Sequence, residues 1–332
     1  MLRSIVAWSA LALGLAFAAH FITPWPSVLV IRAVFDKGAA DASAALEKHV
    51  PADVTAREAI RYDPGDPDAL FDIYRAARPR PGAPTIVWVH GGGFVSGRRG
   101  DIANYLKVLA GQGFTTVNID YTIAPGATYP TPVRQVTRAL AFLDRHAEEL
   151  GINRESLVIA GDSAGAQIAA QVANLVTSPA YAAQVGIASP IRAEQLDGTL
   201  LYCGVYDMEA LGRSGSGALG WFLRTVAWAY GGERDWREVE AFEQMSVARH
   251  MTPAFPATFI SAGNDDPLEP QSRIMDDALR ARGVRVESLF YPDGHEPALS
   301  HEYQFDLDGA DGRHALARSV AWLSSLPGQP AR

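Results

Sequence analysis

The 332-residue chain has one cysteine, Cys203, few charged residues (20%) and no run of lysine or arginine. One cysteine cannot form an intrachain disulfide and cannot supply a cysteine-rich zinc or iron–sulfur site. Acidic residues outnumber basic ones by 37 to 29, a net charge of −8. This excess argues against a nucleic-acid partner, because such partners are bound largely by neutralising phosphates. The 48% of hydrophobic residues suffice for a folded core, in one large α/β domain or two ordinary ones.

Charge is also missing from Ile5–Ile22, close to the N-terminus. This stretch approaches the length of about 20 apolar residues that a membrane-spanning helix needs. Ala16-Phe17-Ala18 resembles a signal-peptide cleavage site, whereas Trp25-Pro26 slightly favours retention at a membrane interface. We therefore predict that residues 1–25 are a signal peptide or an N-terminal membrane anchor, and both alternatives stay open. Either one implies an extracytoplasmic protein, secreted or periplasmic in the first case and in contact with the membrane in the second.

Beyond residue 60, short apolar or β-branched runs alternate with longer segments of helical periodicity. Helical spacing of apolar residues is visible between Val136 and Leu150 and again between Leu316 and Leu323. Such alternation predicts a mainly parallel central sheet with helices on both faces. The candidate strands are Phe71–Tyr74, Thr85–His90, Thr115–Asp120, Leu157–Gly161, Thr199–Cys203, Thr258–Ala262 and Val286–Tyr291.

Two segments depart from this alternation. Residues 26–60 include the alanine-rich Ala39–His49 and are expected to be lead-in or cap helices. Residues 206–256 form an interval that is too long for an ordinary connection and too apolar for a disordered loop. We predict that this interval is a helical cap, with a pair of long surface helices as the alternative.

The strongest local motif is Gly161-Asp162-Ser163-Ala164-Gly165, which follows an apolar run and precedes a segment of small residues. A Gly-x-Ser-x-Gly pattern between a strand and a helix is typical of a nucleophile elbow, where a sharp turn exposes the serine hydroxyl. The pattern alone is often a plain turn, but its position favours the elbow. Asp162 is expected to have a structural role, because the turn directs it away from the serine.

A second motif, His90-Gly91-Gly92-Gly93-Phe94, follows the candidate strand that begins at Thr85. Consecutive glycines let backbone N–H groups approach a ligand, and acyl transfer needs such donors for the oxygen that becomes negatively charged. A flexible turn or a phosphate loop is the alternative. The motif lacks both the G-x-G-x-x-G spacing and a Walker lysine, so it does not favour nucleotide binding.

With these two motifs about seventy residues apart, the chain resembles the hormone-sensitive-lipase-like branch of the α/β-hydrolases. Asp120-Tyr121-Thr122-Ile123-Ala124-Pro125 is similar to the Asp-Tyr-Arg-Leu-Ala-Pro segment of that family. The resemblance covers roughly residues 60 to 326 and implies an α/β-hydrolase catalytic domain over residues 61–328. It further implies that Ser163 is the nucleophile and that the N–H groups of Gly92, Gly93 and Ala164 form the oxyanion hole.

In α/β-hydrolases the nucleophile is followed along the chain by an acid and then by a histidine. Asp265-Asp266-Pro267-Leu268 follows a candidate strand, and the resemblance to an Asp-Pro-Leu tripeptide selects Asp266 over Asp265. The histidine is either His301 or His295. We favour His301, because His301-Glu302-Tyr303 looks like the His-x-aromatic motif of the family. This choice makes the loop at residues 292–300 longer than usual.

The spacing of His295 and His301 along the chain does not match that of a metal site. His295 and His301 lie farther apart than the histidines of an H-E-x-x-H zinc motif, and residues 306–311 lack the pattern of a calcium loop. We therefore expect neither a metal nor another cofactor. The resemblance implies a serine carboxylesterase that acts on small esters of short to medium acyl chain. An amidase or lactonase with the same triad, or a hydrolase-fold protein that only binds a ligand, are the alternatives; the oligomeric state is left open.

Overall fold

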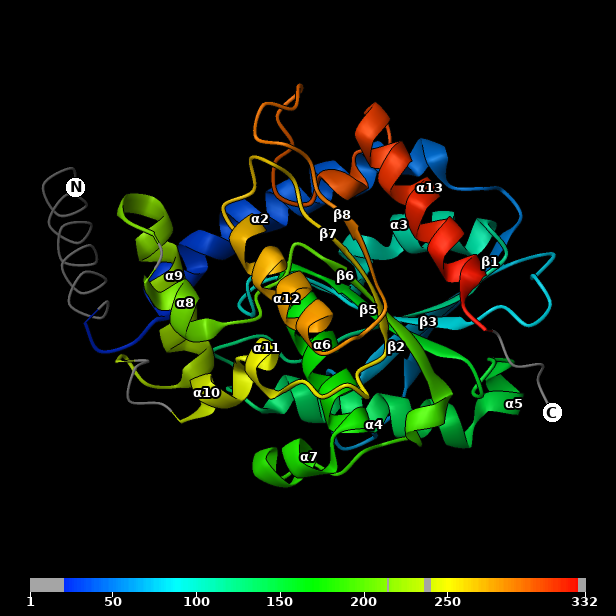
Figure 1. Cartoon of the computed structure of the whole chain (residues 1–332), viewed down its shortest axis with the longest axis horizontal. Helices are drawn as coiled ribbons and strands as arrows, with labels where there is room; N and C mark the ends of the chain where they lie inside the picture. The colour runs from blue at the N-terminus through cyan, green and yellow to red at the C-terminus, as the bar shows by residue number, and fades with distance from the viewer. Residues whose placement is uncertain (1–20, 214, 236–239, 328–332) are drawn as a thin grey trace, which may run out of the picture.

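The computed structural model describes residues 21–213, 215–235 and 240–327. They form an eight-stranded sheet in the order β1-β2-β4-β3-β5-β6-β7-β8, surrounded by helices (Figure 1). The strands are β1 Val54–Arg61, β2 Leu70–Ala76, β3 Thr85–Val89, β4 Thr115–Ile119, β5 Leu157–Asp162, β6 Leu196–Tyr202, β7 Ala257–Ser261 and β8 Val286–Leu289.

The sheet is mainly parallel, as the alternation of runs predicts. β1 and β2 pair antiparallel, as do β2 and β4, whereas every pairing from β4 across to β8 is parallel. The seven predicted strands are all present, with ends shifted by a few residues. Because the parallel strands point the same way, the segments that follow β3, β5, β6, β7 and β8 meet at one edge of the sheet.

Helices cover both faces of the sheet, and the side-chain alternation of the strands feeds a core on each side. In β3, Ile86 and Trp88 belong to one buried cluster, whereas Val87 and Val89 belong to the other. The first cluster includes side chains of α3 (Arg99–Gly111) and α13 (Ala310–Ser325), and the second includes side chains of α4 (Thr131–Arg145), α6 (Ser163–Thr177) and α12 (Glu269–Ala281). This period of two explains why the strands read as nearly continuous apolar runs.

The helices vary from one turn to more than five turns. They are α2 Trp25–Leu46, α3 Arg99–Gly111, α4 Thr131–Arg145, α5 Ala147–Leu150, α6 Ser163–Thr177, α7 Pro179–Val185, α8 Met208–Arg213, α9 Gly217–Gly231, α10 Ala241–Met245, α11 Val247–His250, α12 Glu269–Ala281 and α13 Ala310–Ser325, with 3₁₀ turns at Glu47–His49, Ala193–Gln195 and Tyr303–Phe305.

The expectation of helices throughout residues 26–60 is wrong in its last part. Val54–Arg61 is strand β1, so the sheet begins before the boundary expected at residue 61. β1 is an edge strand whose side chains are mostly exposed, and a shift in its pairing with β2 lies between Arg57 and Ile60. An exposed and irregular edge strand has no apolar alternation in its sequence, which is why the pattern did not indicate it. The helical part begins earlier than expected, at Trp25.

The predicted cap is helical where the structure describes it. Within residues 206–256 lie α8, α9, α10 and α11, and α9 packs beside α2 at one end of the molecule (Figure 1). None of the helices in the described part of the chain is both long enough and apolar enough to cross a membrane. The predicted signal peptide or anchor lies outside the described residues as far as residue 20 and stays a prediction, together with the extracytoplasmic location.

Candidate active site

Ser163 stands on a sharp turn at the carboxyl end of β5, directly at the start of α6. Its φ is +50°, a strained value for a residue with a side chain. The flanking glycines make this turn possible. A Cβ on Gly165 would lie 2.1 Å from the carbonyl oxygen of Val89, and one on Gly161 would lie 2.5 Å from the backbone of Gly165. The motif therefore has the geometry of a nucleophile elbow packed against β3.

This close approach predicts a stability effect. Gly165→Ala should lower the free energy of unfolding by more than about 2 kcal/mol, because the new methyl group collides with the backbone rather than with a movable side chain. Gly100→Ala is the matched control, since a Cβ there meets no atom within 4 Å. It should change stability by less than about 1 kcal/mol. Urea unfolding of both variants measures the difference, and equal effects would contradict the tight packing of the elbow.

Three side chains from three separate loops form a hydrogen-bonded chain at the carboxyl edge of the sheet. His301 Nε2 lies 3.0 Å from Ser163 Oγ, and His301 Nδ1 lies 2.9 Å from Asp266 Oδ2. Asp266 is 4% exposed, and its second carboxylate oxygen accepts the N–H of Leu268 at 2.8 Å. The histidine is thus held between a buried carboxylate and the serine hydroxyl, the arrangement that activates a serine nucleophile.

His295 and Asp265, the alternative candidates for the triad histidine and acid, make other contacts or face solvent. His295 Nε2 is 3.2 Å from Asp311 Oδ2 at the start of α13, and the His295 ring contacts Tyr291. Asp265 is exposed, whereas Asp266 beside it is buried. The structure therefore brings His301 and Asp266, the pair favoured from the sequence, together beside Ser163.

A long connection from β8 brings His301 to Asp266. The amide of Asn264 bridges the two loops, because its Oδ1 accepts the N–H of Leu299 at 2.9 Å and its Nδ2 donates to the carbonyl of His295 at 3.2 Å. A Cβ on Gly263 would lie 2.1 Å from the carbonyl oxygen of Leu299, so the loops are in direct backbone contact. The connection at residues 292–300 is thereby tied to the loop that carries Asp266.

The glycine motif lies opposite Ser163, in the predicted position. Gly92 and Gly93 have φ of +110° and +60°, values that glycine adopts without strain. Within the described part of the chain, no hydrogen bond takes up the N–H groups of these two residues. Ala164 lies in the first turn of α6, where backbone N–H groups also lack a partner in the helix. All three residues line the same cavity as Ser163.

Contacts that could not be predicted from the sequence hold the shape of the glycine loop, by which we mean residues 90–97. The His90 ring stacks on Tyr121 at 4.3 Å, and the Tyr121 hydroxyl donates to the carbonyl of His90 at 3.0 Å. From α2, the Arg32 side chain donates to the carbonyl oxygens of Val95 at 2.6 Å and Ala124 at 3.0 Å. A charged residue inside an otherwise apolar stretch was the one signal that could have pointed to this inward role.

Asp162 has the structural role expected of it. Its carboxylate accepts the indole N–H of Trp88 at 2.7 Å and the N–H of Gly91 at 2.8 Å, so it connects the elbow to the glycine loop. Burial and the nearby Glu302 carboxylate raise the pKa of Asp162 well above its ordinary value, although the two hydrogen bonds act in the opposite direction. The net effect favours the protonated form of Asp162.

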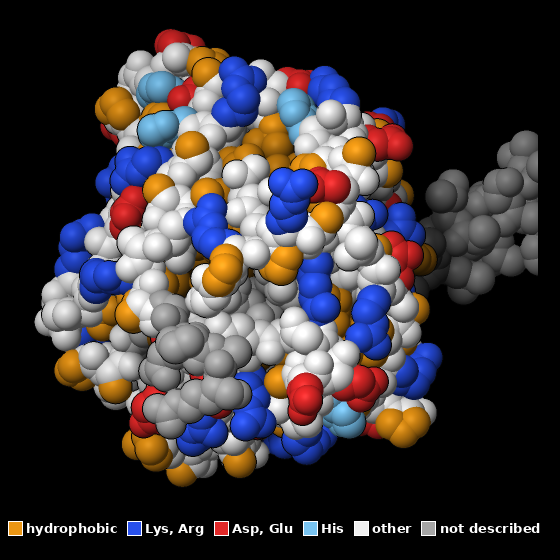
Figure 2. Space-filling model, turned by 90° about the vertical axis from the view of Figure 1, so that its right-hand side faces the viewer, with side chains coloured by type: hydrophobic (Ala, Val, Ile, Leu, Met, Phe, Trp, Pro, Cys, Tyr) orange, Lys and Arg blue, Asp and Glu red, His pale blue; other side chains and the backbone are white. Residues whose placement is uncertain are grey.

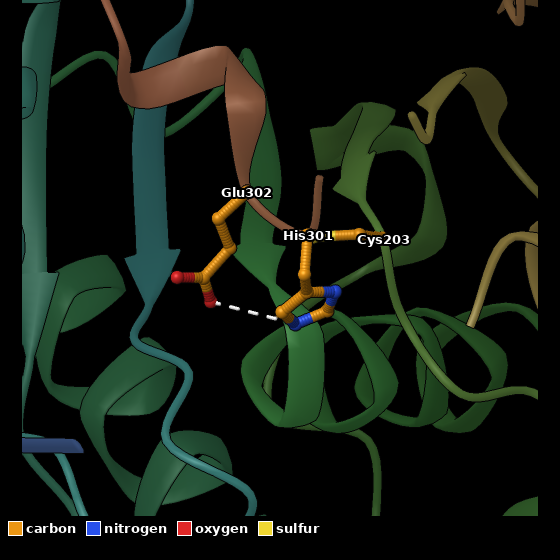
Figure 3. A group of neighbouring side chains, drawn as sticks. All are labelled: Cys203, His301 and Glu302. Carbon is orange, nitrogen blue, oxygen red and sulfur yellow. Dashed lines mark ion pairs between the residues drawn. The ribbon is translucent and has the colours of Figure 1, made fainter. Parts of the chain in front are cut away.

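The surroundings of His301 favour its charged form. Burial opposes protonation, but Cys203 and the carboxylates of Asp266 and Glu302 outweigh it and raise the pKa of His301 well above the ordinary value. Figure 3 shows Glu302 approaching the imidazole, with its Oε1 3.8 Å from His301 Nε2. Glu302 has a φ of +63°, so this contact is made from a strained backbone.

Cys203, His301 and Glu302 also form a group whose potential metal-binding atoms lie within 4.8 Å of one another (Figure 3). Burial raises the pKa of the Cys203 thiol to about 11, although His301 acts against this rise. A metal ligand must be a thiolate, which this environment disfavours. Both ring nitrogens of His301 are also engaged, by Asp266 and Ser163. The group does not fit a metal centre.

A cavity of about 580 Å³ leads to Ser163, a volume typical of small-molecule sites. Its walls are mostly apolar and come from α2 and the cap, with the Phe35 and Phe222 rings 5.4 Å apart. The wall residues are Val34, Phe35, Gly38, Ala39, Ala42 and Leu46 from α2, and Leu219, Phe222, Leu223, Val226 and Ala227 from α9. A cap at residues 206–256 was predicted from the sequence, but the contribution of α2 to the cavity wall was not.

Comparison with known proteins finds a family with the same fold. The model of a family described as having an α/β hydrolase fold matches residues 86–296. The acetyl esterase of Salmonella paratyphi B is 28% identical over 215 residues, which are 63% of each chain, and that of Salmonella typhi is 27% identical over the same share. The chain thus spans less than two thirds of the length of these curated relatives.

Two solved structures are similar over nearly the whole chain. Esterase B from Lactobacillus rhamnosis has 22% identity and a TM-score of 0.75, covering 90% of this chain and 95% of its own. The esterase of Pyrobaculum calidifontis has 21% identity and a TM-score of 0.70, covering 91% and 94%. At this low sequence identity, the similarity to these two structures shows a common fold and no more.

Proposed function

The chain belongs to the α/β-hydrolase fold family, and we propose that it is a serine carboxylesterase that hydrolyses short- to medium-chain carboxylic esters through an acyl-enzyme. The observation that carries this proposal is the hydrogen-bonded chain of Ser163, His301 and Asp266 beside the glycine loop. The acetyl esterase function of the curated relatives supports it as well.

In the first step the Ser163 hydroxyl attacks the ester carbonyl and His301 Nε2 accepts its proton. The bond between the carbonyl carbon and the leaving alkoxide breaks, and His301 returns the proton to that oxygen. Asp266 keeps Nδ1 protonated and stabilises the imidazolium that forms. In the second step a water molecule replaces the alcohol, and the acyl-enzyme is hydrolysed to the acid and free Ser163.

Each step passes through a tetrahedral intermediate with a negative oxygen. The N–H groups of Gly92, Gly93 and Ala164 are the donors for this oxygen in our proposal. They are backbone groups held in place beforehand, so they need no rearrangement during the reaction. Loss of one such donor typically lowers turnover about 10²–10³-fold.

The cavity supports an apolar substrate of limited size. Its walls are aromatic and aliphatic, and the side chains of Ser163 and His301 lie among its lining residues. The ring of Phe222 lies close to the glycine loop: a Cβ placed on Gly93 would be 3.0 Å from the Phe222 ring. We infer that the Phe35 and Phe222 rings limit the acyl or alcohol chain that fits beside the oxyanion hole.

A series of p-nitrophenyl esters from acetate to palmitate tests the proposed activity. The kcat/KM for butyrate should exceed that for palmitate at least about tenfold, because several methylene groups of palmitate fall outside the cavity. The anilide of butyric acid tests the amidase alternative and should react at least about 100-fold more slowly than the ester. Faster hydrolysis of the anilide, or no hydrolysis of any ester, would contradict the proposal.

The pH dependence should report the raised pKa of His301. A general base works only when neutral, so kcat/KM falls as the pH drops through the pKa of the free enzyme. Because that pKa is raised, the midpoint of this acid limb should lie above the ordinary histidine value of about 6.5. Glu302→Gln removes one group that favours the imidazolium and should move the midpoint to lower pH. An unchanged midpoint in this variant would exclude Glu302 as a determinant of that pKa.

A further inference from the structure

The N-terminal half of α2 and the turn before it carry an exposed apolar strip, made of Ile22 from the turn and Trp25, Leu29, Val30 and Val34 from the helix. Their exposed fractions run from 41% for Trp25 to 81% for Ile22. Within the described part of the chain, every exposed large hydrophobic side chain lies in the segment 21–34. Such a contiguous surface on a folded protein marks a contact with another apolar partner.

This part of α2 is apolar around its whole circumference. Val28 and Ile31 on its inner side are buried in the core, at 0% and 3% exposure, while Leu29 and Val30 face outward at 57% each. The charged Arg32 does not interrupt the outer side, because its guanidinium binds the carbonyl oxygens of Val95 and Ala124. A helix that is hydrophobic on every side needs a cover on every side, and the described residues provide only the inner one.

A lipid bilayer is the cover that fits these features. No charged residue occurs between Arg3 and Arg32, so the strip continues an uncharged stretch of sequence. Trp25 and Pro26 stand at its start, and tryptophan is enriched at membrane interfaces. Exposed charges return directly beyond the strip, at Asp36, Lys37 and Asp41, and the side chains of Lys37 and Asp41 are 76% and 67% exposed. An exposed apolar surface between a tryptophan and a charged turn fits insertion to the depth of the membrane interface.

The opposite end of the molecule has a different surface. Figure 2 shows that face, on which Lys, Arg, Asp and Glu side chains are interspersed with small groups of hydrophobic ones. The strip is therefore a local feature of the end formed by α2 and α9 (Figure 1).

The strip also leads to the active-site cavity. Val34 is 65% exposed and lines the cavity at the same time, and two of the cavity residues further along α2, Gly38 and Ala42, are exposed too. A bilayer against the strip would thus adjoin the rim of the cavity. Asp36, two residues after Val34, accepts a hydrogen bond from Ser96 of the glycine loop at 2.7 Å, so α2 joins the surface to the site.

We propose that the apolar strip of α2 inserts into the surface of a lipid bilayer and that the cavity receives its substrate from the membrane. The substrate class is then an ester whose acyl or alcohol part dissolves in the bilayer. This second part of the proposal rests on the proposed esterase function, whereas the docking of the strip does not.

A fluorescent probe on the strip of the full chain tests the docking. Cys203 is buried with a raised pKa, so an added surface cysteine reacts selectively with a nitrobenzoxadiazole probe. We expect labelled Val30→Cys to show blue-shifted, stronger emission with phosphatidylcholine–phosphatidylglycerol vesicles, and quenching by nitroxide-labelled lipid in them. His314→Cys on the exposed side of α13 is the control and should not respond.

Every other outcome overturns the docking. If the vesicles bind the chain but the probe at position 30 stays in water, the membrane contact lies outside the strip. If the probe is buried without vesicles and its burial increases with protein concentration, a second copy covers the strip. If that burial is independent of concentration, another part of the same chain covers it.

The activity part needs a separate pair of substrates. The double variant Leu29→Gln and Val30→Gln should hydrolyse p-nitrophenyl acetate in solution as the parent does, since neither residue lines the cavity. Its hydrolysis of 4-methylumbelliferyl heptanoate in vesicles should fall at least about fivefold, because the apolar docking surface is lost. Equal rates of parent and variant on vesicles overturn the delivery route. If the parent hydrolyses neither ester, the proposed function fails, while the probe result still decides the docking.

Discussion

Ser163→Ala is expected to lower kcat for p-nitrophenyl butyrate by about 10⁴–10⁶, because the acyl-enzyme cannot form without the hydroxyl. The residual rate comes from the oxyanion donors and from substrate binding, which the substitution leaves in place. Steady-state kinetics of parent and variant, at enzyme concentrations that reveal the slow reaction, measure the ratio.

Two controls separate chemistry from folding in this experiment. Ser189 is exposed and away from the cavity, so Ser189→Ala should keep kcat within about twofold. Thermal unfolding should show Ser163→Ala folded, because alanine occupies the same strained φ of +50° without losing a packing contact. A folded Ser163→Ala protein that hydrolyses the ester at the parent rate would refute the nucleophile.

His301→Ala should lower kcat/KM by about 10⁴ or more, whereas His295→Ala should stay within about tenfold of the parent. The difference follows from the contacts of the two rings. His301 Nε2 is 3.0 Å from the Ser163 hydroxyl, whereas His295 is paired with Asp311 beside α13. Without the His301 ring, the Ser163 hydroxyl has no base. Without the His295 ring, only the contact between residue 295 and Asp311 is lost.

Equal and mild losses in the two histidine variants would refute both candidates. A large loss in His295→Ala with little loss in His301→Ala would exchange their roles and contradict the geometry. Asp266→Asn extends the comparison, because an amide cannot hold the imidazole in the required tautomer, and it should lower kcat about 10⁴-fold.

The features that could be predicted from sequence depend on local patterns. Glycine is the residue that close backbone approaches and positive φ values require, so the glycines around Ser163 indicated the sharp turn directly. The candidate oxyanion donors came from the resemblance to the family and stay a prediction. The alternation of apolar runs was enough for a mainly parallel sheet, since each buried strand supplies both cores.

The features that sequence left open depend on contacts between distant segments. The positions of His301 and His295 depend on how the loop at residues 292–300 folds, and Asn264 holds that loop by accepting the N–H of Leu299. Strand β1 was missed because its exposed edge position leaves no apolar period. The raised pKa of Asp162 arises first from burial, which spacing along the chain does not reveal.

Labelling with a fluorophosphonate, followed by mass spectrometry of the peptides, tests the serine esterase mechanism most directly. Phosphonylation requires a serine activated by its base and stabilised by the oxyanion donors, so the reaction reports the whole arrangement in one product. We predict one adduct, on Ser163, which is absent in Ser163→Ala and forms far more slowly in His301→Ala. An unlabelled Ser163 in a preparation that hydrolyses esters, or an adduct on a different residue, would contradict the mechanism.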